Sequence, residues 1–430
     1  MKIAIVHERL DVIGGAERVI ASLHRLYPDA PLYTSFVDHS ILTDEFRTMD
    51  IRSSYMQKLP QWVKKRSDRL LPFYLFAFQN FDLSAYDVVL SSSYVAAKSV
   101  LTPADTCHIC YCHTPMRYGW EKFPQYINTV RPGVFKVLNQ ALLQYFRMWD
   151  YQTAQNVDYF ISTSDAVAQR IRKHYRRESH KIHPPVETRR FTPSEKPDDY
   201  YLAISRLVPY KRIDLAVEAF QKLNRKLLII GTGREYDRLK KLGGRNVEFL
   251  GWQSDDRVAD YMSRARALIF PGEEDFGIVP VEAQASGTPV IAYGVGGIRE
   301  TVRHGETGYF FTEQTAESLA EAVQQFECLN LSRKSIVAHA RQFDEGRFHQ
   351  EIEEFIDQCR REFHSGQRPL PPFSRPLPVG VGRWIPSRVR RRSAWPSGVR
   401  RTGRSGFVAR SLRASGVRAD ENNRGGIAGV

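Results

Sequence analysis

Short apolar runs that alternate with helical patterns are the main signal along the chain. In the first half they fall at Lys2–Val6, Leu32–Val37, Val88–Ser92, His108–Cys112 and Tyr159–Thr163. A second series follows at Tyr201–Ser205, Lys226–Ile230, Val247–Leu250, Ala267–Phe270 and Val290–Tyr293. Runs of this length, followed by a turn or an amphipathic stretch, indicate buried strands. Strands that alternate with helices predict an α/β fold with doubly wound parallel sheets.

A polar segment punctuated by proline separates the two series and is typical of a domain linker. An amphipathic run after the second series predicts a closing helix. The residues beyond it are rich in Pro, Gly, Ser and Arg, and they predict a disordered tail because few of their apolar residues are spaced to build a core. The expected divisions are a first domain at 1–186, a linker at 187–199, a second domain at 200–345, the closing helix at 346–365 and the tail at 366–430.

The formal charge of +14 on 430 residues would by itself suggest a nucleic-acid or membrane partner. Most of this charge lies in the tail 366–430, which holds fourteen arginines, no lysine and two acidic residues. The rest of the chain is close to neutral, so we expect no nucleic-acid partner. The tail is interpreted either as drifted carboxyl-terminal sequence or as an arm that binds anionic lipid or a partner.

The five cysteines are few and odd in number, which fits a reducing compartment. Three of them lie in the string CHICYCH at 107–113, which is typical of a buried strand with alternating faces, so no metal site is expected there. The amino terminus carries Glu8 and Arg9 and lacks the apolar stretch of a signal peptide, and no run of about 18 uncharged apolar residues occurs. We expect a cytoplasmic protein whose membrane contact is peripheral, at the inner face.

The most informative segment is PGEEDFGIVPVEAQASGTP, from Pro271 to Pro289. An apolar strand leads into its Pro-Gly break, and a helical run begins just beyond Gly277. Glu274 is therefore expected on a strand-to-helix loop, and Glu282 about one turn inside the helix. In a parallel α/β sheet this loop lies at the carboxyl end of the strands, where ligands bind. Each carboxylate could hold a different part of one ligand.

This segment resembles the E-x7-E signature of retaining GT-B glycosyltransferases, in particular those of family 4, or group 1. The resemblance rests on a Glu-x-Phe-Gly turn, a closing Glu-Ala pair and a small-Gly-x-Pro-Val run, and it extends over roughly residues 1–363. It implies a GT-B fold, with two Rossmann-like domains across a cleft, and transfer of a sugar with retention. It also implies that Glu274 holds the transferred sugar and Glu282 the nucleotide ribose. The substrate-binding residues between them are Phe276, Gly277 and Ile278.

A second match to the family is SRLVPYKRIDLAVEAF, from Ser205 to Phe220. The resemblance places Arg206 and Lys211 on the diphosphate of the nucleotide. Two fixed cations can stabilise the charge that builds on a departing nucleoside diphosphate. No Asp-x-Asp motif of the metal-dependent sugar transferases occurs in a plausible loop. We therefore expect chemistry without an obligatory metal or other cofactor.

Glycines and one histidine at other predicted strand ends complete the candidate site. Gly14 and Gly15 precede a helix, where backbone N–H groups can approach a phosphate, although a plain tight turn has the same sequence. The GxGxxG spacing of dehydrogenases is absent. By resemblance, His113 in YCHTPMRYGW approaches the sugar from the first domain. Gly231 and Gly233 are expected to turn beneath the nucleotide.

The segment Trp62–Phe81 mixes basic and aromatic residues, which suits either a helix on anionic lipid or a partly buried helix with a solvated face. The strings HERLDVIGGAE and YCHTPMRYGW look most like the mannosyltransferases of bacterial O-antigen and exopolysaccharide assembly. The resemblance therefore implies GDP-mannose as the donor and a lipid-linked saccharide or growing surface glycan as the acceptor. Few residues distinguish one hexose from another, so the sugar itself stays open.

Other functions remain open at the level of sequence. A GT-B phosphorylase or a nucleotide-sugar epimerase would share the fold but not the reaction. A non-catalytic subunit of a polysaccharide-assembly complex would be expected to lose the motif, whereas Glu274, Glu282, Arg206 and Lys211 are all present. A nucleic-acid-binding protein would depend on the tail alone.

Overall fold

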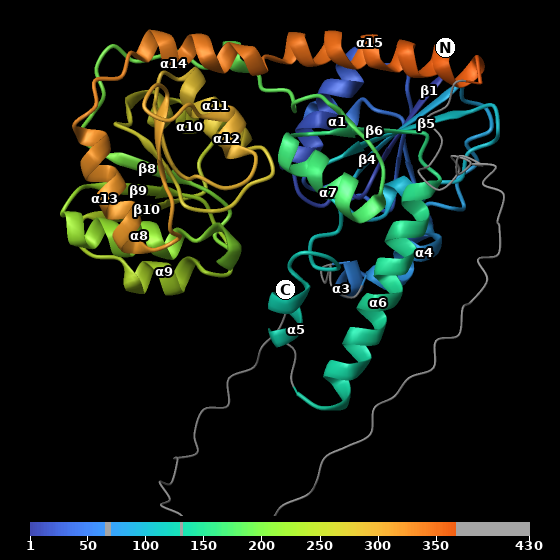
Figure 1. The fold of residues 1–430 in the computed structure, drawn as a ribbon, viewed down its shortest axis with the longest axis horizontal. Coiled ribbons are helices and arrows are strands. Elements are labelled where there is room, and N and C mark those ends of the chain that lie inside the picture. Colours follow the sequence, from blue (N-terminus) through green and yellow to red (C-terminus); the bar gives the residue numbers. More distant parts are fainter. Residues whose placement is uncertain (65–69, 130–131, 367–430) are drawn as a thin grey trace, which may run out of the picture.

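Two parallel sheets, each flanked by helices, form two domains that stand side by side (Figure 1). The computed structural model describes residues 1–64, 70–129 and 132–366. Apart from Gly366, the predicted tail 366–430 lies outside the described residues, as do positions 65–69 of the predicted helix Trp62–Phe81. Both domains have the doubly wound α/β architecture that the sequence predicts.

The sheet of the first domain has seven parallel strands among the described residues, in the order β3-β2-β1-β4-β5-β6-β7. Its central strands are buried along their whole length because helices cover both faces. The strands are β1 (Ile3–His7), β2 (Leu32–Thr34), β3 (Ile51–Ser53), β4 (Val88–Ser93), β5 (Cys107–Cys112), β6 (Tyr159–Ser162) and β7 (His180–Lys181). The helices are α1 (Gly15–Leu26), α2 (Asp44–Arg47), α3 (Gln61–Lys64), α4 (Leu71–Ala77), α5 (Phe123–Thr129), α6 (Val134–Gln155) and α7 (Asp165–Tyr175).

The second sheet repeats this order with the six strands β10-β9-β8-β11-β12-β13 in the described part of the chain. Its strands are β8 (Tyr201–Ile204), β9 (Leu227–Ile230), β10 (Val247–Gly251), β11 (Leu268–Phe270), β12 (Val290–Tyr293) and β13 (Gly308–Phe311). Its helices are α8 (Ile213–Leu223), α9 (Tyr236–Leu242), α10 (Asp255–Arg264), α11 (Ile278–Ala285), α12 (Ile298–Thr301), α13 (Ala316–Glu327) and α14 (Arg333–Ala340).

Three strands that the apolar pattern did not predict all lie at sheet edges, namely β3, β7 and β13. An edge strand has neighbours on one side only, so it needs less apolar sequence. The two residues of β7 are exposed, and the second and third residues of β3 are exposed as well. Low apolar content therefore explains why β3 and β7 were missed, whereas β13, with the sequence GYFF, was missed although it is apolar.

The predicted closing helix is α15 (Glu345–His364), which crosses from the second domain back to the first (Figure 1). Its buried side chains recur every three or four residues, as in an amphipathic helix that covers a core. They join the core of the first domain, and they are Phe348, Ile352, Phe355, Ile356, Cys359 and Phe363. The two chain segments that cross between the domains run side by side, because Val186 pairs with Asp344.

Candidate active site

The candidate residues of the second domain lie where the strand order of its sheet reverses. This switch point falls between β8 and β11, as it falls between β1 and β4 in the first sheet. Loops that leave two such strands diverge and form a crevice in which ligands bind. The loop after β8 carries Arg206 and Lys211, and the loop after β11 carries Glu274. The structure therefore brings these three residues to one edge of the sheet.

Lys211 donates a hydrogen bond to the Glu274 carboxylate, and both side chains are mostly buried. Gly272 lets the two loops approach, because a Cβ at that position would stand 3.1 Å from the Lys211 carbonyl oxygen. Arg206 lies on the exposed side and donates to the Tyr210 hydroxyl at 3.0 Å. Burial and the Arg206 charge lower the pKa of Lys211 to about 8. The pair thus places one negative and one positive group at the ligand edge.

Glu273, which precedes Glu274 in the chain, is bound from the first domain. It accepts hydrogen bonds from Arg117 at 2.6 Å and from Lys122 at 2.9 Å. Burial raises the pKa of Glu273, but the Lys122 hydrogen bond and the Arg117 charge outweigh it and leave that pKa below its usual value. Glu273 therefore stays ionised and ties the candidate loop to the opposite domain.

Asp275, on the other side of Glu274, is also held across the domain boundary. Arg170 of α7 donates to its carboxylate, and the same guanidinium reaches Glu273 at 3.2 Å. The three first-domain cations that hold this loop, here called the cation clamp, are Arg117, Lys122 and Arg170. The three acidic residues 273–275 thus have different partners. Glu274 accepts from Lys211 of its own domain, while Glu273 and Asp275 on either side of it are bound by the cation clamp.

The backbone of the same loop is held by glycines of the turn after β12, which has the sequence GVGG at 294–297. The Gly297 N–H donates to the Glu274 carbonyl oxygen at 2.9 Å. Gly296 has a φ of +86°, and a Cβ there would stand 2.3 Å from that oxygen. A side chain at this position would push the loop away. The carboxylate of Glu274 is therefore presented by a loop with little freedom to move.

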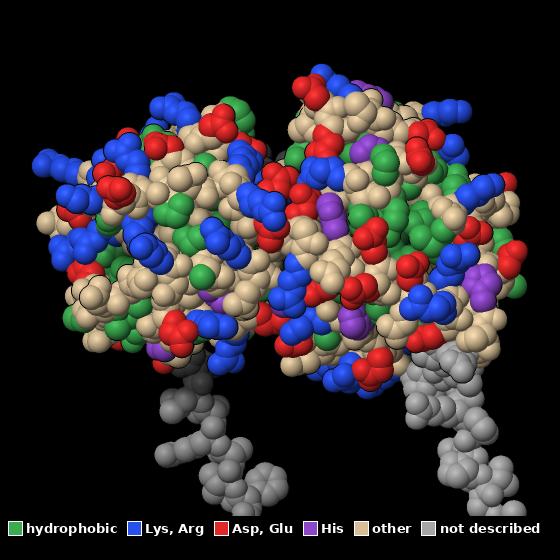
Figure 2. Space-filling model, turned by 90° about the horizontal axis from the view of Figure 1, so that it is seen from above, with side chains coloured by type: hydrophobic (Ala, Val, Ile, Leu, Met, Phe, Trp, Pro, Cys, Tyr) green, Lys and Arg blue, Asp and Glu red, His purple; other side chains and the backbone are tan. Residues whose placement is uncertain are grey.

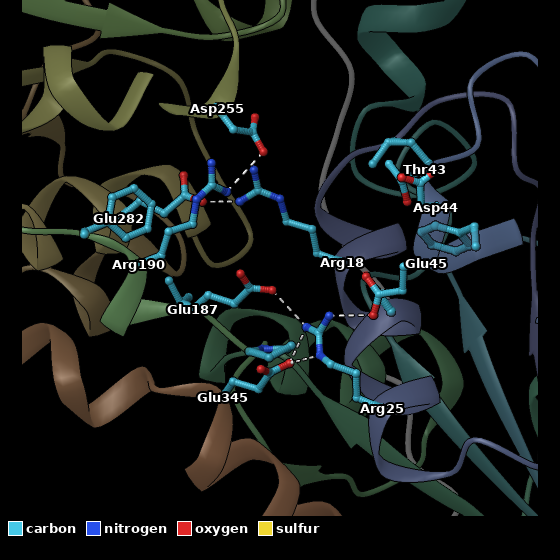
Figure 3. A pocket seen from close by; sticks show the side chains of 16 residues that line it. Arg18, Arg25, Thr43, Asp44, Glu45, Glu187, Arg190, Asp255, Glu282 and Glu345 are labelled. Carbon is cyan, nitrogen blue, oxygen red and sulfur yellow. Dashed lines mark hydrogen bonds and ion pairs between the residues drawn. The ribbon is translucent and has the colours of Figure 1, made fainter. Parts of the chain in front are cut away.

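Glu282 is the fifth residue of α11, and it is buried. Arg18 of α1 donates to its carboxylate across the domain boundary (Figure 3). This pair lines a cavity of about 430 Å³ between the domains, whose lining does not include Lys211 or Glu274. In the same cavity Arg25 contacts the carboxylates of Glu45, Glu187 and Glu345 (Figure 3). Charged side chains also gather along the junction of the two lobes in Figure 2.

His113 begins a chain of hydrogen-bonded side chains that runs into the first domain. Its Nε2 lies 2.8 Å from Ser92 Oγ, which lies 3.1 Å from His7 Nδ1. The other ring nitrogen of His7 lies 3.2 Å from Glu17, which accepts from the Gly14 N–H at 2.9 Å. Burial lowers the pKa of His113 to about 3, so its imidazole is neutral at neutral pH. His113 can therefore offer a ligand a hydrogen bond but no charge.

The second glycine of the pair, Gly15, brings the domains into contact. A Cβ there would stand 3.1 Å from Ile278 Cδ1. Ile278 begins α11 directly after Gly277, whose φ of +98° favours glycine. The Phe276 side chain is buried against Phe343, with ring centroids 5.6 Å apart. A contact between Phe276 and a ligand would therefore have to come from its backbone.

The glycines after β9 pack against the loop that carries Arg206. A Cβ on Gly231 would stand 1.9 Å from the Ser205 carbonyl oxygen, and one on Gly233 would stand 2.3 Å from that of Leu207. Their φ angles are +135° and +155°. These two glycines thus allow the turn after β9 to lie directly beneath the Arg206 loop.

Two family models match the chain, one for each domain. The model described as Glycosyltransferase Family 4 matches residues 13–190, and the model described as Glycosyl transferases group 1 matches residues 186–343. Together the two matches extend over more than half of the chain, and they meet at the crossing between the domains. The chain belongs to the group 1 glycosyltransferases.

Curated relatives of this group 1 glycosyltransferase match parts of it. The D-inositol 3-phosphate glycosyltransferase of Nocardia farcinica is 31% identical over 222 residues, which are 46% of this chain and 47% of the relative. The GDP-mannose-dependent alpha-(1-6)-phosphatidylinositol monomannoside mannosyltransferase of Mycobacterium tuberculosis is 32% identical over 155 residues, 32% of this chain and 40% of the relative. The chain thus spans about half or less of the length of these relatives.

A solved structure supports the fold of the group 1 glycosyltransferase. Anabaena Alr3699/HepE, solved in complex with UDP-glucose, superposes with a TM-score of 0.61 and 18% identity. The match covers 83% of this chain and 100% of the Anabaena chain. At this level of identity the likeness establishes the two-domain GT-B fold. Among the described residues of our chain, no group of three or more His, Cys, Asp or Glu side chains is placed to hold a metal ion.

Sequence reasoning placed the candidate residues Arg206, Lys211 and Glu274 on the two loops of the second domain where the structure has them, but it did not identify the residues that hold the site from the first domain. Arg18, which holds Glu282, and the cation clamp were not anticipated. Arg117 lies inside the string YCHTPMRYGW that marked His113, so its position was available as a signal. Arg170 lies within α7 and has no signal in the sequence.

Proposed function

We propose that the protein transfers a hexose, with retention of configuration, from a nucleotide sugar to a lipid-linked or growing surface glycan. The observation that carries this proposal is the Lys211–Glu274 pair at the switch point of the second domain, on a loop held by the first domain. A carboxylate for the sugar and cations for the diphosphate are the groups that such a transfer requires. Membership of the group 1 glycosyltransferases supports the same reaction.

The roles follow from the charge of each group. Arg206 and Lys211 bind the diphosphate and stabilise the negative charge that grows on it as the bond to the sugar breaks. Because two cations serve this purpose, no metal is required for departure of the nucleoside diphosphate. Glu274 accepts hydrogen bonds from the hydroxyls of the transferred sugar. His113, which is neutral, hydrogen-bonds the sugar from the other domain.

Two ion pairs of the structure have to rearrange when the donor binds. Lys211 is bound to Glu274, and Arg18 is bound to Glu282. Glu282 is the residue that receives the ribose hydroxyls, so the nucleoside replaces Arg18 as its partner. Lys211 turns from Glu274 to the diphosphate, which frees Glu274 for the sugar. The nucleotide therefore replaces two internal contacts.

The proposed donor is GDP-mannose. The matched relative from Mycobacterium tuberculosis is named as GDP-mannose-dependent, which agrees with the mannosyltransferase-like strings of the first domain. The names of both matched relatives include an inositol phosphate or phosphatidylinositol acceptor, and an acceptor on a lipid carrier fits the second of these. The site of action would be the cytoplasmic face of the membrane, with the protein attached peripherally.

The test is release of nucleoside diphosphate from a panel of nucleotide sugars in the presence of a membrane lipid extract, with and without a metal chelator. GDP-mannose is expected to turn over, and the chelator is expected to leave the rate unchanged. Glu274→Gln and Lys211→Ala are each expected to lower kcat by about 100-fold, because each removes a group that acts on developing charge.

The matched controls are Glu317→Gln and Lys222→Ala, which remove members of an exposed Lys–Glu pair in the same domain. Both should retain wild-type turnover. If no nucleotide sugar turned over and calorimetry found no nucleotide binding, the protein would be a non-catalytic subunit and the proposal would be wrong. Release of GDP with retained activity in Glu274→Gln would disprove the assigned role of that carboxylate.

A further inference from the structure

The long helix α6 exposes more apolar surface than a helix of a soluble domain usually does. None of residues 134–142 is buried, although most of them are apolar. The exposed fractions are 72% for Val134, 71% for Phe135, 64% for Val137 and 58% for Leu138. Soluble proteins seldom leave contiguous apolar patches of this kind without a partner. This half of α6 therefore has an apolar sequence but does not pack against a core.

Residues 134–142 are free on every side of the helix, and from residue 143 onward the exposed residues lie on one side. Val134, Leu138, Tyr145 and Met148 follow one another at spacings close to multiples of 3.6 residues, so their side chains share a face. The opposite side meets the core of the first domain through Leu143, Phe146, Asp150 and Thr153. Figure 1 shows the amino-terminal half of α6 projecting away from both sheets, on the side of the molecule opposite α15. The free face is thus a protruding arm, here called the α6 arm (residues 134–148).

The charges of the α6 arm are all positive. No acidic residue occurs between Glu121 and Asp150, whereas Lys136 and Arg147 lie in the arm itself. Lys136 is partly exposed and stands between the most exposed apolar residues of the arm. Lys136 thus places a basic side chain among free apolar residues, a combination that binds anionic lipid surfaces, whereas the Arg147 guanidinium donates to the Gly119 carbonyl oxygen at 2.7 Å within the domain. The exposed Trp62 of the same domain, at 64%, is a residue typical of membrane interfaces.

A second copy of the chain fits this face less well. Lys136 and Arg147 are both basic, so a pair of α6 arms would bring like charges together with no acidic residue from either arm to oppose them. The apolar face is also short, covering about two heptads, whereas stable coiled coils need three or four. None of the described helices is long and apolar enough to span a bilayer, so the contact in question lies at a membrane surface.

We infer that the α6 arm docks the protein on a bilayer that contains anionic phospholipid, with Val134, Val137 and Leu138 inserted among the lipids. The arm is connected to the active site, because α5 and α6 follow directly after Lys122, which binds Glu273 beside Glu274. A docked arm therefore holds the site close to the membrane surface. The inference rests on the proposed lipid-linked acceptor for its purpose, while vesicle binding itself requires no donor.

The experiment is sedimentation of the full chain with phosphatidylcholine vesicles, with and without phosphatidylglycerol. The wild type is expected to bind the anionic vesicles more tightly and to lose affinity as salt is added. Val137→Glu combined with Leu138→Glu should weaken binding by about tenfold or more, because two charges enter the inserted face. Lys136→Glu, which reverses one charge, should weaken binding about tenfold to anionic vesicles and little to neutral ones.

The matched control is Gln324→Glu with Gln325→Glu, which makes the same change of net charge at exposed positions of α13 and should bind like the wild type. All variants keep residues 366–430, so a loss of binding reports on α6. Failure of the wild type to bind vesicles, or full binding by Val137→Glu with Leu138→Glu, would overturn the inference. So would a wild-type dimer in light scattering that this variant dissociates. Calorimetry with GDP tests the donor site separately, because nucleotide binding needs no vesicle.

Discussion

The two domains share one strand order, but their ligand edges are filled differently. In the first domain Glu8 follows β1, and its Oε1 accepts hydrogen bonds at 2.7–3.1 Å from Ser93 Oγ and from the backbone N–H groups of Tyr94, Val95, Ala96 and Ala97. In the second domain the corresponding edge presents Arg206 and Lys211. The N–H groups at the edge of the first sheet are thus bound by the protein's own carboxylate, whereas the edge of the second sheet presents two cations, which under the proposed function bind the diphosphate.

This difference shows how one topology can serve two roles. Successive backbone N–H groups after a strand bind whichever anion is available, whether it belongs to the chain or to a ligand. Because Glu8 satisfies the N–H groups of residues 94–97 internally, these groups are not free to bind a phosphate. The donor is therefore expected to bind to the second domain, and the first domain to complete the site around the sugar.

The largest effect should come from removing Glu8, the carboxylate that binds the N–H groups at the ligand edge of the first domain. Glu8→Ala would leave four backbone N–H groups buried without an acceptor, so the free energy of unfolding should fall by about 3 kcal/mol or more. Affinity for GDP in the folded variant should change by less than about twofold, because the nucleotide binds elsewhere. Urea unfolding and calorimetry measure the two quantities.

Asp82→Ala is the control for this variant. Asp82 accepts similar hydrogen bonds from Ser84, but it is fully exposed, so its loss should change stability far less. A Glu8→Ala protein with normal stability and no affinity for GDP would mean that Glu8 belongs to the donor site. The contrast between the two domains would then be wrong.

A smaller effect is expected from releasing the clamp. Arg117→Ala combined with Lys122→Ala removes two of the three clamp cations that contact Glu273, so the loop that carries Glu274 is held less firmly against the first domain, with Arg170 as the remaining clamp residue. We expect kcat to fall by about tenfold, equivalent to about 1.4 kcal/mol, with little change in the Kd of GDP. Steady-state kinetics and calorimetry separate these outcomes.

The control for the clamp is Arg172→Ala, which breaks an exposed ion pair with Glu178 inside the first domain and should leave kcat unchanged. Arg117→Lys combined with Lys122→Arg keeps both positive charges and should retain most of the wild-type rate. Equal loss in this variant and in the double alanine variant would show that the clamp acts through something other than its charges.

The smallest effect is a pH dependence of GDP affinity, which should arise from Lys211 at the ligand edge of the second domain. Lys211 has a pKa lowered to about 8, so it is charged below that pH and loses its proton above it. Affinity for GDP should therefore fall by up to about tenfold between pH 7 and pH 9. Lys211→Arg, which stays charged, should abolish this dependence. A wild-type affinity that is flat across this range would mean that Lys211 does not contact the diphosphate.

The sequence predicted those parts of the fold and site that depend on local pattern. The central strands are continuous apolar runs, so they were found, whereas β3 and β7 are short and exposed. Glu274, Arg206 and Lys211 follow predicted strands, and parallel topology alone brings such loops to one edge. Their meeting was therefore foreseeable from residues close to each strand end.

The remaining features depend on packing between distant segments. The partner of Glu273 is Arg117, 156 residues away, and the partner of Glu282 is Arg18, 264 residues away. Phe276 belongs to the family motif, yet its ring lies in a core, because the motif does not state which side chains face the ligand. The α6 arm has an ordinary amphipathic sequence, and only the placement of its neighbours leaves it uncovered. The described residues of the predicted helix Trp62–Phe81 lie in α3 and α4 and the turn that follows, with Trp62 exposed and Phe78 buried, and contact of this segment with lipid stays a prediction.

Helix α15 has a consequence for the order in which the protein is made. Six of its side chains complete the core of the first domain, although they follow the entire second domain in the chain. A nascent chain that has left the ribosome as far as residue 344 holds every strand of the first sheet but lacks that part of its core. The second domain can thus finish folding during synthesis, while the first domain, which is translated earlier, reaches its final stability later.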